Sequence, residues 1–232
     1  MSNSLRTVAL LPMKAHSERI PGKNFKEFAG RPLFQWVLET LLGIPEIERI
    51  IINTDGREVL ASHGLEPNDR VLVRDRPTEI CGDEVSMNRI IENDMSAVPA
   101  DTYVMTHTTN PLISEKTIRD AIQFFREGVQ NGANDSVFTV SRLQSRFYDS
   151  DGKALNHDPD RLLRTQDLPP IFEENSNLYV FSKESFQSTN ARIGKTPKML
   201  ETPFLESFDI DDADGWHLAE LVASSKQSGF TA

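Results

Sequence analysis

Strand-like and helix-like stretches alternate along the first 140 residues, and this alternation limits the possible folds more than any other feature of the chain. Short apolar runs, typical of strands buried on both faces, occupy residues 7–11, 49–53, 71–73, 102–106 and 136–140. The stretches between them carry apolar residues at helical spacing. The pattern predicts an α/β fold, with a Rossmann-like, mostly parallel sheet and helices on both of its faces.

The alternation stops between residues 141 and 202. This stretch is polar, is interrupted by several prolines and contains one apolar run, at 178–181. Irregular segments of this length are uncommon in compact domains unless they have a function, so we expect a lid or an oligomer contact within one domain. Order returns at 208–211, which looks extended, and Asp212 is well placed to cap a last helix.

Charge and composition argue against several classes of partner. The formal net charge is -10, which disfavours general binding of nucleic acid or of anionic membranes. No apolar run approaches membrane-spanning length. The single cysteine, Cys81, excludes an internal disulfide and fits a reducing compartment. We expect a cytoplasmic protein with no nucleic-acid or membrane partner, in which any anionic ligand is captured by a local basic patch.

One such patch directly follows the first predicted strand. Between residues 14 and 31 there are five cations against two anions, and these cations are Lys14, Arg19, Lys23, Lys26 and Arg31. The Pro21-Gly22 turn offers backbone N–H groups which, beside lysines, suit a polyphosphate. The loop is not of the Walker A type, because Ser17 stands where the first glycine belongs. Ligands bind at the carboxyl ends of strands in such sheets, so we favour a phosphate site over an ordinary solvated loop.

A second constellation is the pair Asp209 and Asp211. In an extended segment, residues two apart point to the same side, and two adjacent carboxylates repel each other. A divalent cation relieves that repulsion, and Mg²⁺ prefers carboxylates together with phosphate oxygens. The alternative is a turn that caps the last helix, but Asp212 and Asp214 are available for that role.

The segment LLPMKAHSERIPGKN, residues 10–24, resembles the N-terminal signature of CMP-sugar-acid synthetases. Similarity to the acylneuraminate cytidylyltransferases then continues in order along nearly the whole chain, through segments 53–56, 76–83, 106–112 and 208–211. The resemblance implies a nucleotide-diphospho-sugar-transferase-type fold and a single cytidylyltransferase domain, residues 1–232. It also implies condensation of CTP with a nonulosonic acid, release of pyrophosphate, a Mg²⁺ requirement, and a homodimer to which 141–202 contributes.

Carried over position by position, the resemblance assigns a role to each of twelve residues. Lys14 and Lys23 would hold the triphosphate and, with Asp211, would be catalytic. The nucleotide-binding residues would be Lys14, Ser17, Lys23, Asn24, Arg76 and Asp83. Asp209 and Asp211 would be the ligands of Mg²⁺. The residues that contact the sugar would be His107, Asn110, Glu173 and Asn175.

Three of the predicted site residues depart from the family pattern, as does Ile113, which stands where arginine is usual. Lys14 stands where arginine is usual, and His107 replaces a glutamine. Glu173 lies where relatives carry an arginine that would recognise an acidic sugar, so we expect another cation to take over or the substrate to differ from N-acetylneuraminate. Candidate replacements are Arg142, Arg146 and Arg164.

Two other functions stay open at this point. One is another sugar nucleotidyltransferase, which activates Kdo or a neutral sugar phosphate. A neutral substrate would explain Glu173. The other is a non-catalytic nucleotide-binding regulator. Retention of Lys23, Asp209 and Asp211 argues for an enzyme, because loss of these residues would mark a regulator.

Overall fold

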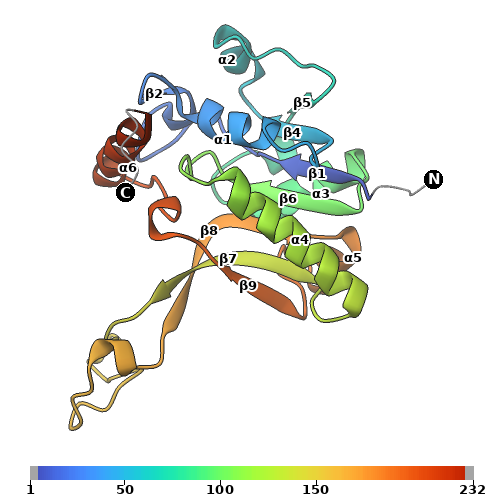
Figure 1. Ribbon diagram of the computed structural model, residues 1–232. Helices are drawn as coiled ribbons and strands as arrows, with labels where there is room; N and C mark the ends of the chain where they lie inside the picture. The colour runs from blue at the N-terminus through green and yellow to red at the C-terminus, as the bar shows by residue number, and fades with distance from the viewer. Residues whose placement is uncertain (1–4, 228–232) are drawn as a thin grey trace.

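The computed structural model describes residues 5–227 and contains a seven-stranded sheet with helices on both faces (Figure 1). The strand order is β5-β4-β1-β6-β8-β7-β9, in which only the pairs that involve β8 are antiparallel. The predicted α/β fold with a mostly parallel sheet is confirmed. The strands of this sheet are β1 (Thr7–Leu10), β4 (Arg49–Thr54), β5 (Val71–Asp75), β6 (Thr102–Thr106), β7 (Ser136–Leu143), β8 (Ile171–Phe181) and β9 (Pro197–Glu201).

The helices fall where the sequence places them, with one short addition, and a small hairpin lies outside the sheet. Among residues 5–227, no helix has the length and apolar character needed to cross a membrane. The helices are α1 (Leu33–Leu42), α2 (Arg57–Ser62), α3 (Met87–Ala97), α4 (Glu115–Asn131), α5 (Lys183–Thr189) and α6 (Ala213–Gln227). The hairpin pairs β2 (Glu27–Phe28) with β3 (Arg31–Pro32). Asp212 caps α6 as expected, because its Oδ1 accepts a hydrogen bond from Gly215 N at 2.8 Å.

Alternating side chains of the buried strands divide the core between the two faces of the sheet. Ala9 and Leu11 belong to the cluster covered by α1 and α4, whereas Val8 and Leu10 belong to the cluster covered by α3 and α5. Because both faces are covered, β1 is apolar at every position, which explains its continuous hydrophobic run. A third cluster lies under α6, where Phe28 meets Trp216.

The irregular segment, expected at 141–202, is shorter in the structure. The chain between β7 and β8, residues 144–170, projects from the body as an arm (Figure 1). The rest returns to the body, with β8 between β6 and β7, followed by α5 and by β9 at the sheet edge. The sequence conceals β8 because its first half is polar, and only 178–181 reads as a buried strand. Residues 208–211, expected to be extended, join no strand.

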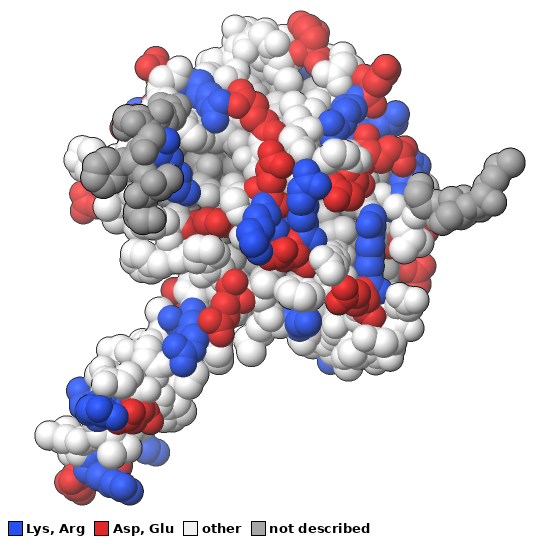
Figure 2. Space-filling model, viewed as in Figure 1, with Lys and Arg blue, Asp and Glu red and all other residues white. Residues whose placement is uncertain are grey.

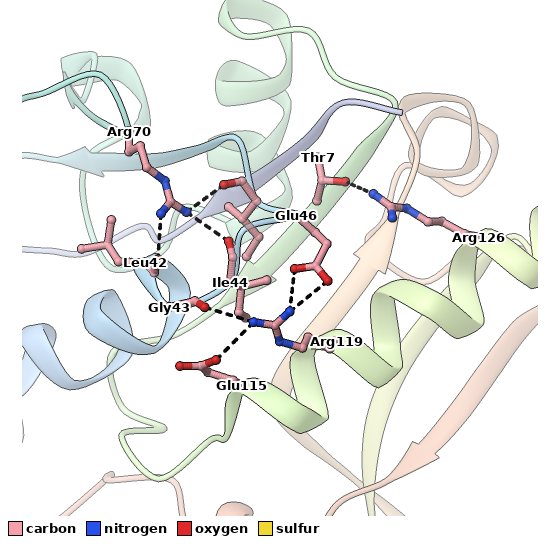
Figure 3. Close-up of polar contacts among 10 residues, drawn as sticks. Thr7, Leu42, Gly43, Ile44, Glu46, Arg70, Glu115, Arg119 and Arg126 are labelled. Atoms are coloured by element: carbon pink, nitrogen blue, oxygen red, sulfur yellow. Dashed lines mark hydrogen bonds and ion pairs between the residues drawn. The ribbon is translucent and has the colours of Figure 1, made fainter. Parts of the chain in front are cut away.

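Arginines fasten the amino-terminal edge of the sheet to the helices (Figure 3). Arg70 donates to three main-chain carbonyls at the end of α1 and in the loop after it, and Arg119 of α4 pairs with Glu46 at 2.8 Å and with the Gly43 carbonyl. On the face drawn in Figure 2, cations alternate with anions and the described residues form no extended basic surface.

Candidate active site

A cavity of about 360 Å³ opens at the carboxyl ends of β1, β5 and β6. Its wall comes from the loops that follow these strands, which are far apart in sequence and meet because parallel strands end at the same edge. Seven residues predicted as site residues line it: Lys14, Ser17, Lys23, Asn24, Arg76, Asp83 and His107. The structure therefore brings the predicted nucleotide-binding residues together with one predicted sugar contact.

The loop after β1 is shaped by Gly22. This residue has φ 62°, in the left-handed region where glycine carries no steric penalty, and its carbonyl accepts from Lys26 N at 3.0 Å. The turn starts a short 3₁₀ helix at Lys23–Phe25 and buries the side chains of Lys23 and Asn24. Two polar side chains thereby sit on the cavity wall rather than in solvent.

Lys23 is a buried cation of the cavity wall. Its Nζ donates to the Ile210 carbonyl at 2.6 Å, which links the first loop to the segment before α6. Burial lowers the pKa of Lys23, and the nearby carboxylates of Asp209 and Asp211 act in the opposite direction. Lys23 is thus a partly desolvated cation, and in such a setting an added negative charge would favour its protonated form.

Lys14 and Asn24 are both engaged with neighbouring loops. Lys14 forms an ion pair with Asp83 across the cavity, and this contact lowers the pKa of the Asp83 carboxyl. Asn24 donates to the Lys14 carbonyl at 2.7 Å and accepts from the Thr108 hydroxyl at 2.6 Å. Asn24 therefore ties the basic loop to the end of β6, and Lys14 is held by a partner that a phosphate can displace.

Arg76 is held by a buried network that sequence reasoning did not find. Its guanidinium donates to the side chain and to the carbonyl of Asn53, each at 2.9 Å. Asn53 donates in turn to Asp94 at 2.8 Å, and Asp94 also pairs with Arg74. Burial raises the pKa of Asp94 to about 6. The sequence held one signal for this network, because Asp94 lies among the apolar residues of α3. A carboxylate at a buried position requires polar partners.

His107 forms the wall at the carboxyl end of β6. It is partly buried, and its pKa falls to about 4, first because of burial and then because of the charges of Arg192 and Lys23. The imidazole is therefore neutral at pH 7. A neutral ring offers a ligand one donor and one acceptor.

Asp209 and Asp211 lie beside the cavity, in a segment anchored by Ile210 N, which donates to the Thr109 carbonyl at 2.9 Å. Burial, with a contribution from Asp211, raises the pKa of Asp209, and Arg19 pairs with Asp211 at 2.8 Å. Within residues 5–227 no three His, Cys, Asp or Glu side chains converge as a complete metal cage. Two carboxylates beside a cavity lined by cations nevertheless fit Mg²⁺, which takes few protein ligands and completes its shell with water or with ligand oxygens.

Three predicted sugar contacts do not line the cavity. Asn110 is fully buried and donates to Asn177 Oδ1 at 2.6 Å. Asn175 donates to the Thr202 hydroxyl at 2.8 Å and so joins β8 to the end of β9. Glu173 is exposed on β8, opposite Ser141 of β7. Asn110 and Asn175 therefore hold the framework together, and Glu173 lies outside the cavity wall.

Only part of the basic loop faces the cavity. Lys14, Arg19 and Lys23 line it. Arg31 instead pairs with Glu39 and packs 4.0 Å from the centroid of the Trp36 ring. The cations after the first strand therefore fall into two groups, one that lines the cavity and one that packs outside it.

Comparison with known proteins agrees with this geometry. A family model described as cytidylyltransferase matches residues 8–214. The chain belongs to the cytidylyltransferase family. This cytidylyltransferase is 25% identical to the CMP-N,N'-diacetyllegionaminic acid synthase of Legionella pneumophila, over 96% of this chain and 98% of that protein. It is 27% identical to N-acylneuraminate cytidylyltransferase B of Danio rerio over 91% of its own length, and it spans 50% of that protein.

A solved structure with a similar fold is a CMP:2-keto-3-deoxy-manno-octonic acid synthetase complexed with CTP. Its TM-score is 0.66 at 16% identity, and the match covers 95% of this chain and 99% of the other. The family resemblance and the enzyme class, a nucleotidyltransferase, are both confirmed. At this identity the structural likeness supports the fold alone.

Proposed function

We propose that this cytidylyltransferase joins CTP to a nonulosonic, sialic-acid-like sugar acid and releases pyrophosphate. The observation that carries the proposal is the cavity in which Lys14, Lys23 and Arg76 converge at the carboxyl edge of the sheet. The relatives named above as a diacetyllegionaminic acid synthase and an acylneuraminate cytidylyltransferase support this substrate class.

The reaction is a displacement at phosphorus. The anomeric hydroxyl oxygen of the sugar forms a bond to the α-phosphorus of CTP, and its proton passes to solvent. The bond from that phosphorus to the bridging oxygen breaks, and pyrophosphate leaves with the electron pair. Such transfers need positioning and charge neutralisation more than covalent chemistry. Lys14 and Lys23 supply the positive charge, and Arg76, fixed by Asn53, supports the base side of the pocket.

Asp209 and Asp211 would hold Mg²⁺ in this proposal. The ion, when bound, would neutralise phosphate charge and orient the triphosphate. The pKa of Asp209 is raised by desolvation and by the neighbouring Asp211 carboxylate, and a divalent cation would relieve the repulsion between the two. Arg19 balances part of that charge through Asp211.

The proposal includes a homodimer formed through the arm, residues 144–170. Four apolar side chains on it are exposed, by 38 to 79%: Tyr148, Leu155, Leu162 and Leu163. Exposed apolar groups collected on one projecting segment favour burial against another surface. We also place the activity in the cytoplasm, in keeping with the single cysteine of the sequence.

Pyrophosphate release with CTP and Mg²⁺ tests the proposal against a panel of nonulosonic acids and Kdo. We expect release with at least one nonulosonic acid, none with UTP in place of CTP, and little with Lys23→Gln. Release with Kdo alone would identify a CMP-Kdo synthetase instead. Binding of CTP without release on any sugar would identify a nucleotide-binding regulator.

A further inference from the structure

A second polar cluster adjoins the His107 end of the cavity. Leu178 of β8 pairs with Thr106, the residue before His107, and Tyr179 follows it. From the other side, Asn190 at the end of α5 accepts through its carbonyl from Asn88 of α3 at 3.0 Å. Two residues further on, Arg192 reaches Tyr179. The cluster Glu174, Tyr179 and Arg192 is therefore placed beyond His107, on the side away from the basic loop.

A strained bulge in β8 creates this cluster. Phe138 of β7 pairs with Tyr179, but Val140 pairs with Glu174, so β8 carries extra residues opposite β7. Within the bulge, Ser176 adopts φ 57°, which is unfavourable for a residue other than glycine. The bulge brings Glu174 back within reach of the Tyr179 hydroxyl, which donates to it. Bulges and backbone strain of this kind concentrate beside functional sites, where they redirect side chains.

Arg192 is unusually free to take a ligand. Its guanidinium stacks 3.9 Å from the centroid of the Tyr179 ring and lies 3.7 Å from Glu174, with the side chain 22% exposed. Within residues 5–227, the guanidinium donates no hydrogen bond, either to Glu174 or to another residue. The structural arginines Arg70 and Arg119 differ sharply, because each donates to several carbonyls or carboxylates (Figure 3). A positioned guanidinium with unused donors is suited to a planar carboxylate, which it binds through two parallel hydrogen bonds.

We propose that Arg192 is the residue that binds the carboxylate of the sugar acid. The inference rests on the proposed function and adds the group that recognises the substrate's charge. Triphosphate binding uses the cations on the opposite side of His107, so an acid at Arg192 would extend from the α-phosphate toward β8. Glu174 holds the guanidinium until the substrate carboxylate replaces it.

Arg192 takes the role for which the sequence suggested Arg142, Arg146 or Arg164. Arg164 pairs with Asp167 at 2.7 Å and Arg146 donates to the Leu163 carbonyl at 2.6 Å, so both are tied to the arm. Arg142 lies on β7 opposite Phe172. Arg192 supplies the charge from the loop after α5, which explains how the chain dispenses with an arginine at position 173.

Steady-state kinetics on Arg192→Gln and Arg192→Lys test the proposal. For Arg192→Gln we expect the KM for the sugar acid to rise about 10- to 100-fold, as loss of a charge-assisted hydrogen-bonding pair requires, with the affinity for CTP unchanged by calorimetry. Arg192→Lys should recover part of the loss. The matched control is Arg31→Gln, which also removes a guanidinium stacked on an aromatic ring and paired with a glutamate, but outside the cavity. The control should leave both constants unchanged.

A substrate analogue gives a second readout, one part of which uses the wild type alone. The carboxamide of the accepted sugar should inhibit the wild type far more weakly than the acid binds, and Arg192→Gln should lose this discrimination. Equal binding of acid and amide by the wild type would overturn the inference even if the variants fail to fold. If the wild type is active, and if Arg192→Gln has the same KM for the sugar acid and the same preference for acid over amide, this inference alone is overturned. A wild type inactive on every acid would overturn the proposed function, and this inference with it.

Discussion

His107 makes the stability of the protein depend on pH in a defined window. Its pKa is about 4 in the folded protein and 6.5 ordinarily, so between these values the native state binds fewer protons than the unfolded chain. The folded protein therefore has its full stability with respect to His107 above pH 6.5, where the imidazole is neutral in both states. This contribution to the free energy of unfolding is lost as the pH falls toward 4. Burial is the main cause, and the charges of Arg192 and Lys23 add to it.

The size of the effect follows from the displacement of the pKa. With a displacement from 6.5 to about 4, lowering the pH from 7 to 5 removes at most about 2 kcal/mol of the free energy of unfolding. For a domain of this length, about 2 kcal/mol corresponds to a fall in Tm of about 4–8 °C. The variant His107→Gln keeps a donor and an acceptor but cannot become charged. Between pH 7 and pH 5, the free energy of unfolding should therefore fall by about 2 kcal/mol less in His107→Gln than in the wild type.

Denaturant unfolding at pH 7 and pH 5 measures this difference, because the other titrating groups are common to both proteins. His107→Asn serves as the matched second substitution and should reproduce the reduced pH sensitivity. Titration of the imidazole by NMR, assigned by loss of its signal in His107→Gln, reports the pKa directly. Equal losses of stability in wild type and both variants, or titration of His107 near 6.5, would refute the argument.

Three further predictions concern the nucleotide, the metal and the arm. CTP with Mg²⁺ should raise the Tm more than ATP, GTP or UTP does, because selective binding to the native state stabilises it; equal shifts would contradict cytidylyl specificity. Asp209→Asn and Asp211→Asn should each lower turnover by about a hundredfold with the fold intact by circular dichroism, and near-normal Mg²⁺-dependent rates would mean that the pair binds no metal. Leu162→Asp should shift a dimer toward monomer in light scattering, whereas a wild type that is monomeric at every concentration would exclude the dimer.

The sequence was sufficient for much of the fold because its first strands are buried on both faces. The loop after β1 was identifiable for the same reason, since its cations stand out directly after an apolar strand. Predicted contacts on β8 failed to reach the cavity because the bulge at Ser176 changes the register there, and no local pattern encodes that shift. Arg192 could not be predicted from the sequence either, because only tertiary packing brings the loop after α5 to Tyr179.

The position of β8 has a consequence for how the protein is made. β8 lies between β6 and β7, yet it leaves the ribosome after both of them. Until residue 181 has been synthesised, β6 and β7 each present an open edge where β8 will pair, and open strand edges promote association with other chains. The arm lengthens that interval, because residues 144–170 must also be translated before β8 emerges. Chains truncated anywhere in the arm should therefore aggregate, although they already contain the entire basic loop and His107.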